Sequence, residues 1–223
     1  MAPEPETLIP KHGGYEHTKS WQLADLIYDV TVRFCDRFVD KRSRTHDQMV
    51  QAARSGCQNL QEGSMDSAVS RKIEIKLTGI ARGSLKELER DFKKFLQHRD
   101  LPEWPLRHPA LMRFKALQCA TLEQFRAWVA AESKLARKGA DGHGPARTDT
   151  KGAAVAVRGG PCSSVSCAAA FPAVCAANGA LSLLNLCIHL IGRQLEAQAA
   201  AFEKEGGFTE RLYRVRSARR HAP

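Results

Sequence analysis

The feature that most constrains the fold of this chain is the spacing of its apolar residues, which recur every three or four positions through long segments. In the segment 17–39 these positions are Leu23, Ile27, Val30, Phe34 and Phe38. Such spacing places the apolar side chains on one face of an α-helix. No stretch alternates between β-branched and polar residues as a strand does. The pattern therefore predicts an all-α protein.

Four further segments with the helical spacing are 45–62, 67–98, 110–135 and 172–205. In the longest, we expect one buried face, made up of Ile73, Leu77, Ile80, Ser84, Leu88, Phe92 and Phe95. Long amphipathic helices in this number are typical of an antiparallel up-down four-helix bundle. We predict such a bundle over residues 15–205, with an extra helical segment at 105–136 that packs outside it or caps one end.

Local signals predict where the second helix begins and ends. Thr45 and Gln48 have the spacing of a capping box, in which the threonine side chain accepts from the backbone three residues on. Gly63 is typical of the left-handed residue that follows the last helical turn. These signals predict a helix from about Thr45 to Glu62.

Three stretches are expected to lie outside the bundle helices. Residues 1–14 are predicted to be a loose N-terminal tail, and residues 206–223 a basic C-terminal suffix. The stretch 137–171 has no Leu, Ile, Met, Trp or Tyr and is rich in Gly, Ala and Ser. Such a composition buries too little apolar surface to offset chain entropy, so we predict a disordered insertion there.

The formal net charge is +10 and the isoelectric point about 9.5. A surplus of this size favours polyanionic partners, RNA or DNA first, although it also promotes simple solubility. The number of cysteines is seven, an odd number at irregular spacings, and no signal peptide is visible. These features predict a reducing cytoplasm.

The stretch 173–192 carries no charged side chain and is long enough to cross a membrane. However, its polar residues form one stripe along the helix, consisting of Asn178, Ser182, Asn185 and His189. A stripe of this kind is typical of an amphipathic bundle helix, so no membrane association is expected. In a monomer the stripe would face water or a polar seam, and in a ring it would line a lumen or a subunit interface.

Two motifs carry a resemblance to a known family. The segment 51–63 contains a set of small and polar residues at fixed spacing: Ala52, Ala53, Ser55, Asn59, Glu62 and Gly63. Residues 80–88 read Ile-Ala-Arg-Gly-Ser-Leu-Lys-Glu-Leu and include Arg82 and Ser84. Both motifs resemble those of the ribosomal-RNA intervening-sequence proteins, a four-helix-bundle family. Gly13-Gly14-Tyr15 and the run 206–213 resemble a bacterial subgroup of that family with a C-terminal suffix.

The resemblance covers residues 13–100 well, residues 172–220 in part, and the insertion not at all. It implies a four-helix bundle but no defined role. A related branch is the accessory protein of diversity-generating retroelements, a basic bundle that forms a ring-like pentamer, binds nucleic acid and partners a reverse transcriptase. That relation implies a homo-oligomeric nucleic-acid adaptor by analogy.

Two groups of cations are candidates for phosphate contacts. The first lies on the third predicted helix and consists of Lys72, Lys76, Lys86, Arg90 and Lys93, with Gly79 and Gly83 at the same spacing. The second lies in the suffix and consists of Arg211, Arg214, Arg216, Arg219 and Arg220. The alternatives are a solvated helix face, glycines that serve close helix packing, and ordinary helix-end cations.

Glu62 is the carboxylate that most needs an explanation, because an acidic residue at a helix C-terminus opposes the helix dipole. We expect it to cap the start of the third helix or to pair with Arg82. A catalytic role is the alternative, but no nucleophile or second placed carboxylate accompanies it. No catalytic residue, cofactor or metal site is predicted.

Taken together, these features predict a non-enzymatic, basic, oligomeric protein of the bacterial cytoplasm that docks nucleic-acid phosphates electrostatically. The alternative is a protein scaffold or a ring-forming partner of an enzyme such as a reverse transcriptase, without direct contact to nucleic acid.

Overall fold

A computed structural model describes residues 7–9, 12–141 and 165–220. A 3-10 turn, Tyr15–His17, leads into the first helix. The seven α-helices of these ranges are α1 Lys19–Phe38, α2 Arg44–Asp66, α3 Arg71–Gln97, α4 Pro109–Leu117, α5 Leu122–Asp141, α6 Val165–Glu205 and α7 Phe208–Arg220. No strand occurs among them. The all-α prediction is confirmed.

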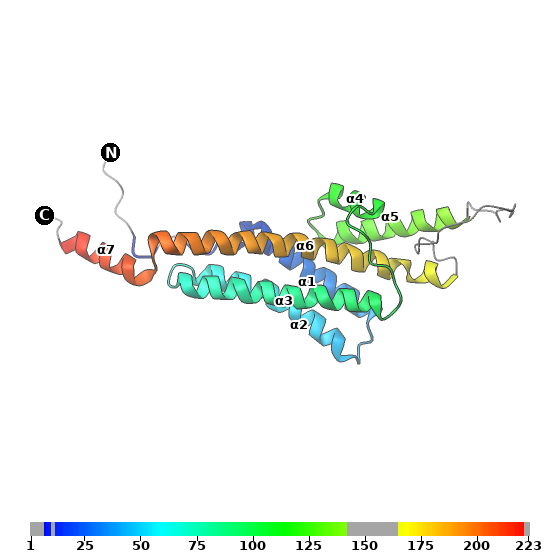
Figure 1. Cartoon of the computed structure of the whole chain (residues 1–223), viewed down its shortest axis with the longest axis horizontal. Coiled ribbons are helices and arrows are strands. Elements are labelled where there is room, and N and C mark those ends of the chain that lie inside the picture. Colours follow the sequence, from blue (N-terminus) through cyan, green and yellow to red (C-terminus); the bar gives the residue numbers. More distant parts are fainter. Residues whose placement is uncertain (1–6, 10–11, 142–164, 221–223) are drawn as a thin grey trace, which may run out of the picture.

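Four long helices share one core. α2 packs against α1 and α3, and α6 packs against the same two helices from the other side. At one end the first turn of α3 meets the last turn of α6, where Arg71 bonds Glu205 at 2.6 Å. The first turn of α1 contacts α6 about three turns earlier, where Ser20 donates to Gln194 at 2.7 Å. Figure 1 shows α4 and α5 beside the other half of α6, while α7 extends from the end of the molecule.

The core is filled by aromatic and aliphatic side chains from all four helices. Phe34 of α1 lies 4.9 Å from Phe92 and 4.7 Å from Phe95, measured between ring centroids. Small residues let the helices approach: a Cβ added at Gly56 of α2 would lie 2.6 Å from Leu85 Cδ2. Burial of such apolar surface is the main force that holds the bundle together.

The second helix begins and ends differently from the prediction. Its N-cap is Ser43, whose side chain accepts from the Thr45 backbone, so the predicted capping box at Thr45 is wrong. The helix also continues past Gly63 to Asp66. Gly63 is buried within the helix, where an added Cβ would lie 3.3 Å from both the Glu74 carbonyl oxygen and Leu77 Cβ. It is needed for close contact with α3, not for a left-handed turn.

The buried face of α3 is also different in its first half. The buried positions are Thr78, Ala81, Leu85, Leu88, Glu89, Phe92, Phe95 and Leu96. The predicted face is correct from Leu88 onward but is rotated before it, and Ile73 and Ile80 are 44% and 45% exposed. The reason is the contact with Gly56 and Gly63 of α2, which turns Leu85 inward.

The extra segment consists of two helices rather than one. Gln118 adopts a left-handed conformation (φ 45°) that separates α4 from α5. A bidentate pair joins them, in which Arg113 donates to the buried Glu132 at 2.7 and 2.6 Å. α5 then packs mainly on α6. These contacts place the segment against the bundle.

Helix α6 begins at Val165 and contains Pro172, so the predicted start at Pro172 is wrong. The predicted insertion 137–171 is helical at both of its described ends, 137–141 and 165–171, and its remaining residues lie outside the described ranges. In the polar stripe, Asn178 is buried, accepts from Trp104 N at 2.7 Å and donates to Pro102 O at 3.0 Å. Asn185 and His189 are exposed.

The end of the N-terminal tail is attached to the bundle. Gly13 N donates to Ser64 O at 3.2 Å, and the Ser64 hydroxyl donates to Gly13 O at 3.1 Å. Among the described residues, one stretch within 170–220 is long and apolar enough to cross a membrane, and 72% of its most apolar window is buried in the protein. The absence of membrane association stays a prediction.

Candidate functional site

A row of cations follows the solvent-facing side of α3. We call it the α3 ridge and define it as Lys72, Lys76, Lys86, Arg90, Lys93 and Lys94. At about 100° per residue, these positions fall within an arc of about 100° around the helix, and no acidic residue lies inside that arc. From Lys72 to Lys94 the ridge extends about 33 Å. Lys94 was missed in the sequence, although it lies one turn after Arg90.

The cations of the α3 ridge differ in how much of their charge is already paired. Glu89 is buried and accepts from Lys86 at 2.9 Å and from Lys93 at 2.7 Å. Burial raises the pKa of Glu89, but the hydrogen bonds from the two lysines outweigh it, so its pKa lies below the ordinary value. In the described part of the chain, Lys72, Lys76 and Arg90 form no side-chain hydrogen bond or ion pair. Arg90 lies near Asp91 and lowers its pKa in part, so Lys72 and Lys76 have the most charge left for a partner.

Gly79 and Gly83 lie in the middle of the α3 ridge and are exposed. A Cβ added at either glycine would meet nothing within 4 Å, whereas one at Gly179 of α6 would lie 2.6 Å from Trp128. The interpretation of this pair as a helix-packing motif is therefore wrong within the chain. The two glycines leave a smooth patch of helix backbone open to solvent.

An apolar strip borders the α3 ridge on the side of α2. It consists of Ile73 and Ile80, which are about half exposed, and the partly buried Leu77. Gly63 of α2 lies opposite Leu77, and Gly56 lies opposite Leu85. This register places Asn59, which lies between the two glycines on α2, opposite the end of the strip just beyond Ile80.

The residues of the two sequence motifs on α2 and α3 make local contacts or, in the described part of the chain, no contact that indicates a role. Asn59 donates to its own helix at Ser55 O, 2.7 Å away. Glu62 is exposed and forms no hydrogen bond or ion pair among the described residues, so the predicted cap and the predicted pair with Arg82 are both wrong. Ser70 caps α3 instead, and Arg82 is turned toward Gly192 of α6. Ser84 lines a polar groove between α2 and α3.

The suffix arginines lie on α7, but they are not equivalent. Arg211 is buried and donates to Ala68 O at 3.5 Å, so its predicted role in phosphate binding is wrong: it holds α7 against the turn before α3. Arg214 donates to Glu205 O at 3.2 Å. Arg216, Arg219 and Arg220 are exposed, and Tyr213 beside them is 74% exposed. The outer half of α7 thus presents three arginines and one aromatic ring.

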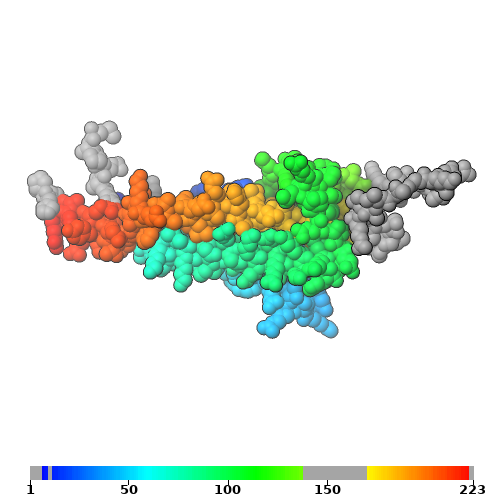
Figure 2. Space-filling view, in the orientation of Figure 1, coloured from blue at the N-terminus to red at the C-terminus, as the bar shows by residue number. Residues whose placement is uncertain are grey.

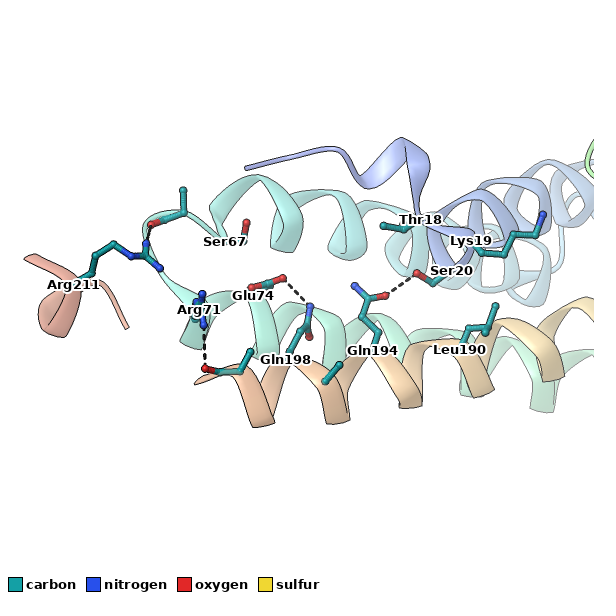
Figure 3. A pocket seen from close by; sticks show the side chains of 13 residues that line it. Thr18, Lys19, Ser20, Ser67, Arg71, Glu74, Leu190, Gln194, Gln198 and Arg211 are labelled. Carbon is teal, nitrogen blue, oxygen red and sulfur yellow. Dashed lines mark hydrogen bonds between the residues drawn. The ribbon is translucent and has the colours of Figure 1, made fainter. Parts of the chain in front are cut away.

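A pocket of about 630 Å³ lies where α1, α3, α6 and α7 meet. Figure 3 shows that its polar side chains point toward one another: Ser20 to Gln194, Gln198 to Glu74 and Arg71 toward the end of α6. Burial raises the pKa of Glu74, and the hydrogen bond from Gln198 only partly opposes this. These pairs join the helix ends, and we assign the pocket a structural role.

The thiols are shielded wherever their side chains are described. Cys35, Cys57, Cys119, Cys175 and Cys187 are free and buried. Burial raises the pKa of Cys35, Cys57 and Cys187 to about 12, which keeps them protonated at neutral pH. Among the described residues, no group of three or more His, Cys, Asp or Glu side chains is placed to hold a metal ion.

No family model, curated protein or solved structure matches this chain. The features that mark its described surface are the α3 ridge, the open glycine pair and the outer arginines of α7. Figure 2 shows α3 along the front face of the molecule, with nothing covering it in this view.

Proposed function

We propose that this chain is a non-enzymatic, basic accessory protein of the bacterial cytoplasm that binds RNA or DNA and acts as a homo-oligomer. The phosphates dock along the α3 ridge, with the outer arginines of α7 as a second contact. The observation that carries the proposal is the open glycine pair, Gly79 and Gly83, on the solvent-facing arc of α3. That arc holds the ridge cations and no acidic residue, and Glu89 at its edge bonds Lys86 and Lys93.

The glycine pair supports the proposal because folding alone does not explain it. A glycine inside an exposed helix costs about 1 kcal/mol relative to alanine. Without side chains at Gly79 and Gly83, a phosphate backbone can approach the helix closely while Lys76 and Arg90 contact it from either side. Closer contact with phosphates would then compensate for the helix stability that the two glycines cost.

Binding of this kind depends on the shape and charge of the nucleic acid more than on its base sequence. Lysine and arginine on one helix face neutralise phosphates and release counterions, so affinity falls steeply with salt. The α3 ridge, at about 33 Å, has nearly the length of one turn of duplex, about 34 Å. Both aromatic side chains of α3, Phe92 and Phe95, are buried, and the exposed Tyr213 lies on α7, so few rings can stack on bases along the ridge.

A second candidate function is that of a protein scaffold, including a ring-forming partner of an enzyme such as a reverse transcriptase. The half-exposed Ile73 and Ile80 beside the glycine pair favour it, because small residues flanked by apolar ones let two helices pack closely. In that case the glycines would contact a second copy of the chain or a partner helix, and the α3 cations would only keep the protein soluble.

The experiment is fluorescence anisotropy of labelled single-stranded RNA and duplex DNA at several salt concentrations. We expect the triple substitution Lys72→Ala, Lys76→Ala and Arg90→Ala to weaken binding and to reduce the salt slope on duplex DNA by about 2.7, since each phosphate contact contributes about 0.9. A matched control removes three exposed cations elsewhere, Arg42, Arg54 and Lys204. Equal slopes for both triple variants, or no binding at low salt, would contradict the proposal and favour the scaffold.

A further inference from the structure

A groove of about 910 Å³ runs between α1 and α5, on a different part of the molecule from the α3 ridge. It exists because α5 packs mainly on α6 and contacts α1 at few positions. Apolar groups form its floor: Val30, Phe34, Phe38, Phe125, Val129 and Pro172. Val129 and Phe38 are partly exposed there, so the floor is accessible from solvent.

The rim of the α1–α5 groove is strongly basic. Its cations are Arg33 and Arg37 on α1 and Arg126, Lys134 and Arg137 on α5, against the acidic Asp36 and Glu123. The charge of Asp36 is already met by Lys41 at 3.4 Å. In the described part of the chain, the three α5 cations form no hydrogen bond or ion pair, so their charge faces the groove without an internal partner.

We propose that the α1–α5 groove is the docking site for an acidic amphipathic helix of a partner protein. Such a helix would place apolar residues, spaced by three and four, on the floor and its carboxylates between the cations of α1 and α5. Charge complementarity selects this occupant over a neutral or basic helix. The α5 side of the groove, from Leu122 to Arg137, extends about 22 Å, the length of a helix of about four turns.

The apolar floor distinguishes this groove from the nucleic-acid surface. A phosphate backbone has no apolar groups to bury, and the α3 ridge has no comparable floor of aromatic rings. Arg37 already lies over the Phe38 ring, 5.3 Å from its centroid, which fixes a cation at the edge of the apolar surface. A partner must therefore offer both apolar side chains and negative charge.

The test uses the full chain and three labelled peptides of about 16 residues, each with the same leucine face and with glutamate, glutamine or lysine on the polar face. We expect the glutamate peptide to bind at least about tenfold more tightly than the glutamine peptide, and the lysine peptide not to bind. Arg126→Glu and Arg137→Glu should each reduce that affinity by about tenfold or more. Lys72→Glu with Lys76→Glu, on the α3 ridge, should leave it unchanged.

Several outcomes would overturn the proposal. One is equal or absent binding of the three peptides to the wild-type chain. A second is a loss of RNA binding in Arg126→Glu as large as that of the α3 variants, which would make the groove part of the nucleic-acid surface. A third is a change in oligomeric state in Arg126→Glu, which would make a second copy the occupant. Because the two sets of substitutions lie on different helices, failure here leaves the proposed function of the α3 ridge untouched.

Discussion

At the scale of single residues, five glycines within the described helices fall into two classes. Gly56, Gly63 and Gly179 lie where a neighbouring side chain or backbone would meet an added Cβ at 2.6–3.3 Å. Gly79 and Gly83 have open space. The first class is explained by packing within the chain, and the second is not, so the second points to something outside the chain.

The two classes predict opposite effects on stability. Gly79→Ala and Gly83→Ala should each raise the free energy of unfolding by about 0.5–1 kcal/mol, because alanine stabilises an exposed helix interior. Gly179→Ala should lower it by about 1–3 kcal/mol, because the added Cβ would overlap the rings of Trp128 and Phe125. Urea unfolding of the three variants measures both. A loss of stability in Gly79→Ala would show that the site is packed after all.

Two carboxylates of α3, the buried Glu89 and the partly buried Glu74, should give the protein opposite responses to acid. The pKa of Glu89 is lowered in the folded state, so its contribution is fully present above the ordinary carboxyl pKa and is lost as pH falls through the folded value. The pKa of Glu74 is raised, so its penalty at neutral pH is relieved as pH falls through that higher value. Glu89→Gln should therefore destabilise the protein at pH 7, and Glu74→Gln should stabilise it.

Urea unfolding at pH 7 and at about pH 3.5 checks this, since the lower value is below the ordinary glutamate pKa. The difference in stability between wild type and Glu89→Gln should shrink at the lower pH. A constant difference would mean that the hydrogen bonds from Lys86 and Lys93 do not depend on the charge of Glu89.

At the scale of elements, α7 is a helix held at one end. Gly206, with a φ of 70°, turns the chain between α6 and α7, and only Arg211 and Val215 of α7 are buried. The other residues of the helix are partly or fully exposed, and their charged side chains are mostly arginines. Its inner part serves the fold, and its outer part is left for a partner.

Arg211→Ala should therefore loosen α7, while Arg219→Ala should not. Loss of the hydrogen bond to Ala68 O and of the buried side chain should speed amide hydrogen exchange in residues 208–215 by about tenfold, the equivalent of about 1.4 kcal/mol of local opening. Arg219, which is exposed, should affect only the salt dependence of RNA binding. Unchanged exchange in Arg211→Ala would mean that the other contacts of α7, among them Val215 and the Arg214 bond to Glu205 O, hold the helix without Arg211.

At the scale of the whole molecule, the monomer does not explain the apolar strip of Ile73, Leu77 and Ile80 or the positive charge beside it. We expect the strip to be a contact between copies of the chain. The double substitution Ile73→Glu and Ile80→Glu should convert an oligomer into a monomer without loss of stability, since both side chains are about half exposed. Light scattering coupled to size exclusion measures this.

Leu106→Glu is the control for the oligomer, because Leu106 is an apolar residue that is 67% exposed and lies in the loop before α4, where its carbonyl accepts from Lys115. It should leave the mass unchanged. A wild-type chain that is already monomeric would contradict the expected assembly and leave Ile73 and Ile80 to a partner protein.

The sequence by itself determined the all-α class, the approximate extent of the long helices and the row of cations on the third of them. Each of these is a local property, since helical periodicity depends only on residues three or four apart. Only the tertiary structure decided which side of α3 faces the core, that Gly63 lies within a helix, and that Arg211 is buried while Gly79 and Gly83 are open. These depend on neighbours far away in the chain: α2 presses Gly56 against Leu85, and the turn at Ala68 accepts from Arg211. The periodicity of a helix does not depend on which helix packs against it. The tertiary contact therefore decides which face of the helix is buried.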